Sequence, residues 1–185
     1  MEYPTDLEFR KVSIDELELL RNLSIQTFRD AFYHLNNPAD IELYMAEAFS
    51  TSQLKYELEL SQSNFVFLVE AGKPIAYYKT NLSPKQSDIN DPTSLEIERI
   101  YVSKAHQNKQ YGQLLLNHIC KHAIQIPTIK FIWLGVWDQN KSAIRFYERF
   151  GFKIFDSHPF LLGTDPQTDL LMRYDLYHNT TNSHH

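Results

Sequence analysis

The sequence predicts a mixed α/β (α+β) protein in which a central sheet of about six to seven strands is flanked by helices. Two observations carry this prediction. Apolar residues at helical spacing dominate the first 62 residues, whereas β-branched and aromatic runs take over from Asn64. Between residues 95 and 150 the pattern is strand, helix, strand, helix, an order that pairs the two strands in parallel through a right-handed crossover.

Length and composition narrow the class of protein. The 185 residues, 43% of them hydrophobic, fit one domain, expected over residues 1–178, with a frayed polar tail at 179–185. With 18 Lys+Arg against 23 Asp+Glu, the net charge of -5 disfavours nucleic acid as a partner. The N-terminus does not resemble a secretory signal, no apolar run approaches the ~20 residues of a membrane span, and a lone cysteine forms no internal disulfide. We expect a cytoplasmic protein that does not enter membranes.

The N-terminal segment is expected to form a short strand near Glu8 to Val12 and then a long amphipathic helix. Ser13 and Glu16 have the spacing of a capping box, which marks a helix start. The apolar positions that follow recur every three to five residues; they are Leu17, Leu20, Ile25, Phe28, Phe32 and Leu35.

Two shorter helices should come next. Asn37 is a good cap ahead of Pro38, which suits a first helical position, and Ser50 with Gln53 repeats the box pattern.

The rest of the chain alternates between strands and helices. A hairpin is expected from 65–69 and 75–82, followed by a loop from Leu82 to Thr93 that is rich in Pro, Asp and Asn. The later expected elements are a strand at 95–102, a helix at 107–126, a strand at 129–136, a helix that includes 143–150, and two final strands near 152–155 and 168–176.

The strand at 95–102 has an irregular pattern. Its apolar residues stand at 95 and 97 and then at 100, 101 and 102, so the alternation slips by one place near Glu98. A β-bulge tolerates such a slip and leaves backbone groups unpaired, ready for a ligand. Burial of both faces at the end of the strand explains the pattern equally well.

The turn at 103–112 opens a helix with two nearby lysines, Lys104 and Lys109. Free N–H groups and the positive end of the helix dipole meet there, which suits an anion such as phosphate. An ordinary strand-to-helix turn is the simpler interpretation of this segment taken alone.

Three motifs follow one another between residues 95 and 152. They are the strand Leu-Glu-Ile-Glu-Arg-Ile-Tyr-Val at 95–102, the turn from Gln107 to Gly112, and Asn140-x-x-Ala143-x-x-Phe146-Tyr147 closing with Gly151-Phe152. Together they resemble the acetyl-CoA-binding core of the GNAT N-acetyltransferases. Within that superfamily, the amino-acid sequences of residues 95–101, 132–137 and 167–170 are similar to those of the PaiA-type polyamine acetyltransferases.

The resemblance implies that acetyl-CoA binds between a splayed pair of parallel strands. The implied coenzyme residues are Ile100, Tyr101, Val102, Gln107, Asn108, Lys109, Gln110, Tyr111, Gly112, Gln113, Asn140, Ala143 and Tyr147. One departure is Gln110, which stands where the family has a glycine; we expect its side chain to hold the backbone at negative φ without removing any N–H donor. Asn140 is equally well explained as a helix cap.

The resemblance also implies a carboxylate base on the strand and a tyrosine acid. An alkylammonium of pKa ~10.4 is neutral in only about one molecule in 2,500 at pH 7, so a base is useful. Glu96 and Glu98 are the candidate bases and lie on one face if the strand is regular, while Tyr147 is the candidate acid for the departing thiolate. Without the resemblance, a surface pair of glutamates and a core tyrosine are the simpler interpretations.

The implied acceptor is a primary amine of a small polycation such as spermidine or spermine. Phe28, Trp137 and Asp138 are expected at the acceptor site. The alternatives are a peptide or protein amine, or a regulatory protein that binds acetyl-CoA without turnover. A homodimer is expected from relatives, and no metal is expected because His118 and His122 lack further ligands at suitable spacing; Cys120 is expected to be a buried apolar residue.

Overall fold

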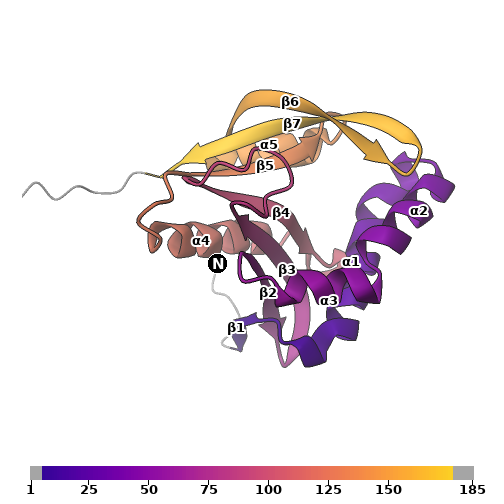
Figure 1. The fold of residues 1–185 in the computed structure, drawn as a ribbon. Helices are drawn as coiled ribbons and strands as arrows, with labels where there is room; N and C mark the ends of the chain where they lie inside the picture. Colours follow the sequence, from indigo (N-terminus) through magenta and orange to yellow (C-terminus); the bar gives the residue numbers. More distant parts are fainter. Residues whose placement is uncertain (1–5, 177–185) are drawn as a thin grey trace, which may run out of the picture.

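The computed structural model describes residues 6–176, which contain one seven-stranded sheet of order β1-β2-β3-β4-β5-β7-β6 (Figure 1). The strands are β1 (Leu7–Lys11), β2 (Ser63–Glu70), β3 (Lys73–Leu82), β4 (Ser94–Val102), β5 (Phe131–Trp137), β6 (Lys153–Leu162) and β7 (Asp165–Asp175). Every neighbouring pair is antiparallel except β4 and β5, which are parallel. The predicted mixed sheet with helices around it is confirmed.

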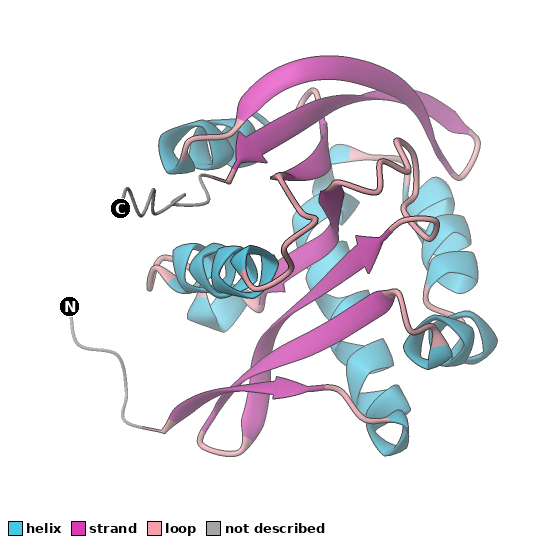
Figure 2. Cartoon of the chain, turned by 60° about the vertical axis from the view of Figure 1, so that its left-hand side comes forward, coloured by secondary structure: helices cyan, strands magenta, loops and turns pink. Residues whose placement is uncertain are grey.

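Helices cover both faces of the sheet (Figure 2). Helices α1 (Leu17–Phe32), α2 (Pro38–Ala48) and α3 (Thr51–Glu59) bury Leu20, Ile41 and Leu54 against one face. Helices α4 (Tyr111–Ile124) and α5 (Lys141–Phe150) bury Leu115 and Ile144 against the other. None of the helices within residues 6–176 is long and apolar enough to cross a bilayer.

The helix ends follow the capping chemistry of the sequence. Asn37 Oδ1 accepts the Ala39 N–H at 2.9 Å, and Ser50 Oγ accepts the Gln53 N–H at 3.2 Å. The Ser13 box forms as predicted, but it starts the 3-10 turn η1 (Ile14–Glu16) rather than α1 itself. The long helix also ends earlier than predicted, because η2 (Tyr33–Leu35) follows as a second 3-10 turn.

The C-terminal hairpin is longer than the sequence pattern predicts. Strand β6 continues to Leu162 and β7 starts at Asp165, so only Gly163 and Thr164 connect them. Asp40, at the start of α2, accepts hydrogen bonds from the Thr164 N–H at 2.6 Å and hydroxyl at 2.7 Å. These bonds dock the hairpin turn on α2, where Figure 1 shows the two side by side.

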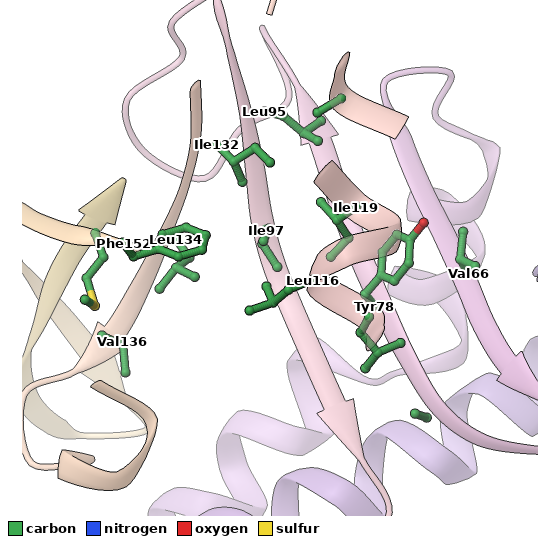
Figure 3. Close-up of a cluster of buried hydrophobic side chains, with 14 of the residues drawn as sticks. Val66, Tyr78, Leu95, Ile97, Leu116, Ile119, Ile132, Leu134, Val136 and Phe152 are labelled. Atoms are coloured by element: carbon green, nitrogen blue, oxygen red, sulfur yellow. The ribbon is translucent and has the colours of Figure 1, made fainter. Parts of the chain in front are cut away.

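A bulge in β4 explains the slip in its sequence pattern. Thr80 of β3 pairs with Ile97, but Lys79 pairs with Arg99, so Glu98 is the extra residue. Leu95 and Ile97 face the α4 side of the sheet, as Figure 3 shows, and after the bulge Ile100 packs on that side again. The bulge, rather than burial of both faces alone, therefore accounts for the irregular alternation.

Strands β4 and β5 separate soon after they meet. Only Ser94 to Glu96 pair with β5, opposite Phe131 to Trp133. Beyond Glu96 the described residues give this edge of β4 no strand partner, so its backbone groups face a gap. The predicted splayed parallel pair is confirmed.

Candidate active site

A cavity of about 550 Å³ opens where β4 and β5 diverge. Its walls come from α1, α2, β4, β5, α5, β6, β7 and the loop between β3 and β4. Glu96, Glu98, Tyr147, Phe28 and Trp137 all line it. The fold thus brings together candidate residues that are far apart in the sequence.

Glu96 is a buried carboxylate, with 1% of its surface exposed, held by three hydrogen-bond donors. Asn81 Nδ2 and the Ser87 N–H each donate to Glu96 Oε2 at 2.9 Å, and the Ser87 hydroxyl donates to Oε1. Burial raises the pKa of Glu96 in spite of these bonds, and the nearby Glu98 raises it further. This carboxylate therefore holds a proton more readily than an ordinary glutamate.

Glu98 lies close to Glu96 in a very different environment. The two share Asn81 Nδ2, which donates to Glu98 Oε2 at 2.6 Å, so both carboxylates reach the same face although the strand is not regular. Glu98 also contacts Lys79 Nζ at 2.5 Å and Arg99 Nη2 at 3.3 Å. Although burial opposes it, these two cations hold the pKa of Glu98 below its usual value.

Tyr147 projects from α5 into the same cavity and packs against the ring of Phe152 at 5.7 Å between centroids. Burial raises the pKa of its phenol, which therefore stays protonated at neutral pH. The residue thus lines the cavity and packs in the core at the same time.

The three residues expected at the acceptor site differ in their placement. Phe28 and Trp137 line the cavity, and Phe28 stacks on Tyr44 at 4.8 Å between ring centroids. Asp138 is not among the lining residues; its backbone N–H donates to the Thr168 carbonyl and its Oδ1 accepts from Gln139.

Sequence reasoning assigned no role to four polar residues in the cavity wall, namely Ser87, Asp88, His158 and Asp169. Asp88 and His158 form an ion pair that joins the loop after β3 to β6. Asp169 stands opposite Trp137 in the β5–β7 pairing. Long-range strand pairing and loop placement bring these residues here; Asp169 lies in the 167–170 segment of the resemblance, but that segment did not indicate its place in the cavity wall.

A second cavity, of about 570 Å³, lies at the start of α4 and shares Val102, Gln107, Asn140 and Ala143 with the first. The other lining residues include Asn108, Gln110, Tyr111, Gly112 and Gln113. Leu114 N–H makes the first bond of the helix, to the Gln110 carbonyl at 3.1 Å, so the preceding turn presents amides of the kind that bind anions.

Gln110 adopts φ 62 and ψ 14, so the expected negative φ is wrong. The turn needs a left-handed residue at this position, which is why a glycine suits it, and the surrounding structure holds glutamine there against a cost of about 1–2 kcal/mol. Gly112 is needed for a different reason. A Cβ on it would lie 3.2 Å from the Phe146 ring, so its lack of a side chain lets α4 approach α5.

Ile100, Tyr101 and Val102 lie beyond the bulge on β4, along the edge that has separated from β5. The Val102 carbonyl already accepts a hydrogen bond from Gln107 Nε2 at 3.2 Å. Asn140 caps α5 through the Ala143 N–H at 3.2 Å, and it also lines both cavities. Its capping role is therefore present in the structure and leaves a role toward the coenzyme open as a prediction.

Comparison with known proteins identifies the family. Residues 29–152 match the family model described as "Acetyltransferase (GNAT) family". The chain belongs to this family. It is 32% identical over 169 residues to an uncharacterized N-acetyltransferase of Lactobacillus delbrueckii, covering 91% of this chain and 97% of the relative.

A curated protein and a solved structure from Thermoplasma acidophilum are also similar to this chain. A spermidine N(1)-acetyltransferase is 25% identical over 155 residues, covering 82% of this chain and 91% of the relative. A crystal structure of PaiA N-acetyltransferase in complex with coenzyme A has a TM-score of 0.75 at 22% identity, covering 92% of this chain and 99% of that one. The protein is thus an acetyltransferase with the acetyl-CoA-binding fold.

The residues present fit this GNAT assignment. The amide-lined turn, the close approach at Gly112 and the unpaired edge of β4 form one continuous surface from the second cavity into the first. The other candidates have structural roles. His118 Nδ1 lies 3.0 Å from the Tyr78 hydroxyl and its ring stacks on Phe9, and burial raises the pKa of Cys120 to about 11.

Proposed function

We propose that this acetyltransferase acetylates a primary amine of a small polycation such as spermidine or spermine. One observation carries the proposal: of the four carboxylates that line the first cavity, Glu96 and Asp169 contact no cation within the described residues, whereas Asp88 pairs with His158 and Glu98 with Lys79 and Arg99. A cavity of this charge attracts an ammonium group and disfavours an anionic acceptor. The resemblance to a protein named as a spermidine acetyltransferase supports the same acceptor class.

Acetyl-CoA would be held by groups from both cavities. The turn from Gln107 to Gln113 offers backbone N–H groups and the positive end of α4 to a diphosphate, with Lys109 close in sequence. The separated edge of β4, at Ile100 to Val102, offers backbone groups to the pantetheine arm. When bound, the coenzyme supplies an acetyl group activated as a thioester.

Glu96 suits the role of base better than Glu98. Glu98 is neutralised by Lys79 and Arg99, which lowers its affinity for a proton, whereas no cation contacts Glu96 within the described residues and its pKa is raised. Glu96 is buried, so we route its proton through the exposed Ser87 hydroxyl, which lines the cavity. Ser87 Oγ passes its own proton to Glu96 Oε1 and accepts one from the ammonium, directly or through water.

Tyr147 is the proposed acid for the departing thiolate. Its raised pKa alone would make proton donation less favourable. Burial also raises the pKa of a thiol, as it does at Cys120. In the same buried surroundings the pKa of the departing thiol would therefore rise too, which reduces the difference between its pKa and that of the Tyr147 phenol. The thiolate would then leave as a neutral thiol.

Thiol release from acetyl-CoA tests the proposed function. We expect release with spermidine or spermine that exceeds the rate with no acceptor and with lysine-bearing peptides. Release with peptides alone would contradict the polycation assignment. Coenzyme binding without release for any amine would contradict turnover of such acceptors.

A further inference from the structure

The strongest unexplained feature of the first cavity is Asp169 on β7. It lines the cavity and is half-buried, yet none of the described residues gives its carboxylate a hydrogen-bond donor or a cation. The other cavity carboxylates are all partnered, Asp88 by His158, Glu96 by Asn81 and Ser87, and Glu98 by Lys79 and Arg99. Partial burial of a carboxylate without a partner is unfavourable, and a cationic ligand would supply the missing charge.

Asp169 lies beside β5, the strand that pairs with β4 at Glu96. Its Oδ2 lies 3.3 Å from where a Cβ on Gly135 would stand, so the side chain leans over β5 at a position that carries no side chain. Trp133, two residues earlier on β5, pairs with Glu96. Trp133 and Gly135 are about 6.8 Å apart along β5, so Glu96 of β4 and Asp169 of β7 approach neighbouring positions of that strand from its two sides.

We propose that Asp169 binds a second ammonium group of the acceptor and so selects diamines and polyamines over monoamines. This inference rests on the proposed function, because it assumes that the reacting amine lies near Glu96. One ammonium would meet the Asp169 carboxylate while the other amine reaches Ser87 and Glu96. The aromatic rings of Phe28, Tyr44 and Phe160 line the same cavity and offer apolar contact to the connecting methylene groups.

The electrostatics of the wall support this role. Burial, together with the nearby Asp138 carboxylate, raises the pKa of Asp169 to about 6. At neutral pH the group is therefore mostly ionised although its surroundings oppose the charge. An ammonium beside it would relieve both the burial cost and the repulsion from Asp138.

Calorimetric titration of the coenzyme A-saturated protein tests the inference with two probes that share a four-carbon chain, butane-1,4-diamine and butylamine. For the natural sequence we expect the diamine to bind at least tenfold more tightly. Asp169→Asn should reduce that preference to about twofold or less, mainly by weakening the diamine. Asp15→Asn, which removes an exposed carboxylate outside the cavity, should keep the full preference.

Several outcomes would overturn the inference: no preference in the natural protein, no binding of either probe, an unchanged preference in Asp169→Asn, or equal weakening of both probes. Asp169→Glu, which keeps the charge, should retain part of the preference and guards against a variant that merely misfolds. Turnover is measured separately with spermidine. Absence of thiol release in the natural protein would contradict the proposed function. The ratio of the affinities for the diamine and the monoamine would still decide the role of Asp169.

Discussion

Glu96 and Glu98 are two residues apart and share one hydrogen-bond donor, yet their surroundings move their proton affinities in opposite directions. Glu98 faces two cations, and Glu96 faces neutral donors only. Environments that separate the pKa values of neighbouring carboxylates commonly divide a structural charge from a reactive one. At this scale, Glu96 has the properties of a base and Glu98 those of an ion-pair partner.

Replacing Glu96 with Gln should lower kcat by about 10²–10⁴-fold, the usual contribution of a positioned base. The pKa of Glu96 lies above its usual 4.5, so kcat/KM of the natural enzyme should rise with pH above 4.5 as the carboxylate ionises. Steady-state rates from pH 5 to 9 would measure this rise, which is the acidic limb of the pH profile. The limb should be absent in Glu96→Gln and present in Glu59→Gln, an exposed control on α3; an unaltered limb in Glu96→Gln would rule out Glu96 as the base.

Gln110 carries backbone strain that a glycine would remove. Gln110→Gly should stabilise the protein by up to about 1 kcal/mol, because relief of the left-handed cost of about 1–2 kcal/mol exceeds the extra freedom that glycine gives the unfolded chain. Urea unfolding measures this change, and calorimetry should find coenzyme A affinity altered less than about threefold. A loss of stability would show that the glutamine side chain makes compensating contacts.

Strands β3 and β4 and helix α3 are joined by a group of four charges, of which Glu57, Lys79 and Arg99 are buried and Glu98 is partly buried. Glu57 of α3 contacts Lys79 Nζ at 3.1 Å and Arg99 Nη1 at 2.9 Å, and Glu98 contacts the same two cations. Two anions and two cations thus balance one another around the bulge. Because Glu98 is the extra residue of that bulge, the group fixes the strand where it separates from β5.

Glu57→Gln should destabilise the protein by about 3–5 kcal/mol, because it leaves the buried Lys79 and Arg99 with a single anion. Urea unfolding followed by circular dichroism gives this free energy. Glu59→Gln on the same helix is exposed and should change stability by less than about 0.5 kcal/mol. Equal effects of the two variants would show that the ion group contributes little.

The slip in alternation in β4 was visible in the sequence because Leu95 and Ile97 are buried and Ile100, Tyr101 and Val102 are partly buried, but the pattern alone left a bulge and burial of both faces equally open. The extent of the β6–β7 hairpin was not predictable, since most of β6 is exposed and its residues carry no alternating pattern. That Glu96, Glu98 and Tyr147 line one cavity was predictable from the resemblance. The placement of Ser87, Asp88, His158 and Asp169 in the cavity wall was not, because each depends on contacts between distant segments.

At the scale of the whole molecule, the acceptor cavity is enclosed by parts of the chain that meet only in the folded state. The loop after β3 reaches Glu96 through Ser87 and reaches β6 through Asp88 and His158. The C-terminal hairpin is in turn docked on α2 by Asp40 and Thr164. The wall of the cavity is therefore held by several separate contacts between distant segments, and we expect the loss of any one of them to loosen it.

His158 should make one of these attachments sensitive to pH. The hydrogen bond to Asp88 raises the pKa of His158 above 6.5, so the stabilisation is fully present below pH 6.5 and is lost as pH rises through the higher folded-state value. The melting temperature of His158→Gln should therefore lie further below that of the natural protein at pH 6 than at pH 9. His34→Gln, on η2, is the control. An equal difference at both pH values would show that the ion pair does not titrate in this way.

Within the described residues, strand β4 pairs with β5 at three positions only. In the sheet, this short pairing is what connects strands β1 to β4 with strands β5 to β7. A coenzyme lying along that seam would touch both halves and act as a cross-link between them. Its binding energy then adds to the cohesion of the enzyme in proportion to RT ln(1 + [L]/Kd). A higher concentration of free coenzyme should therefore add to the stability that the contacts between the two parts of the sheet already give.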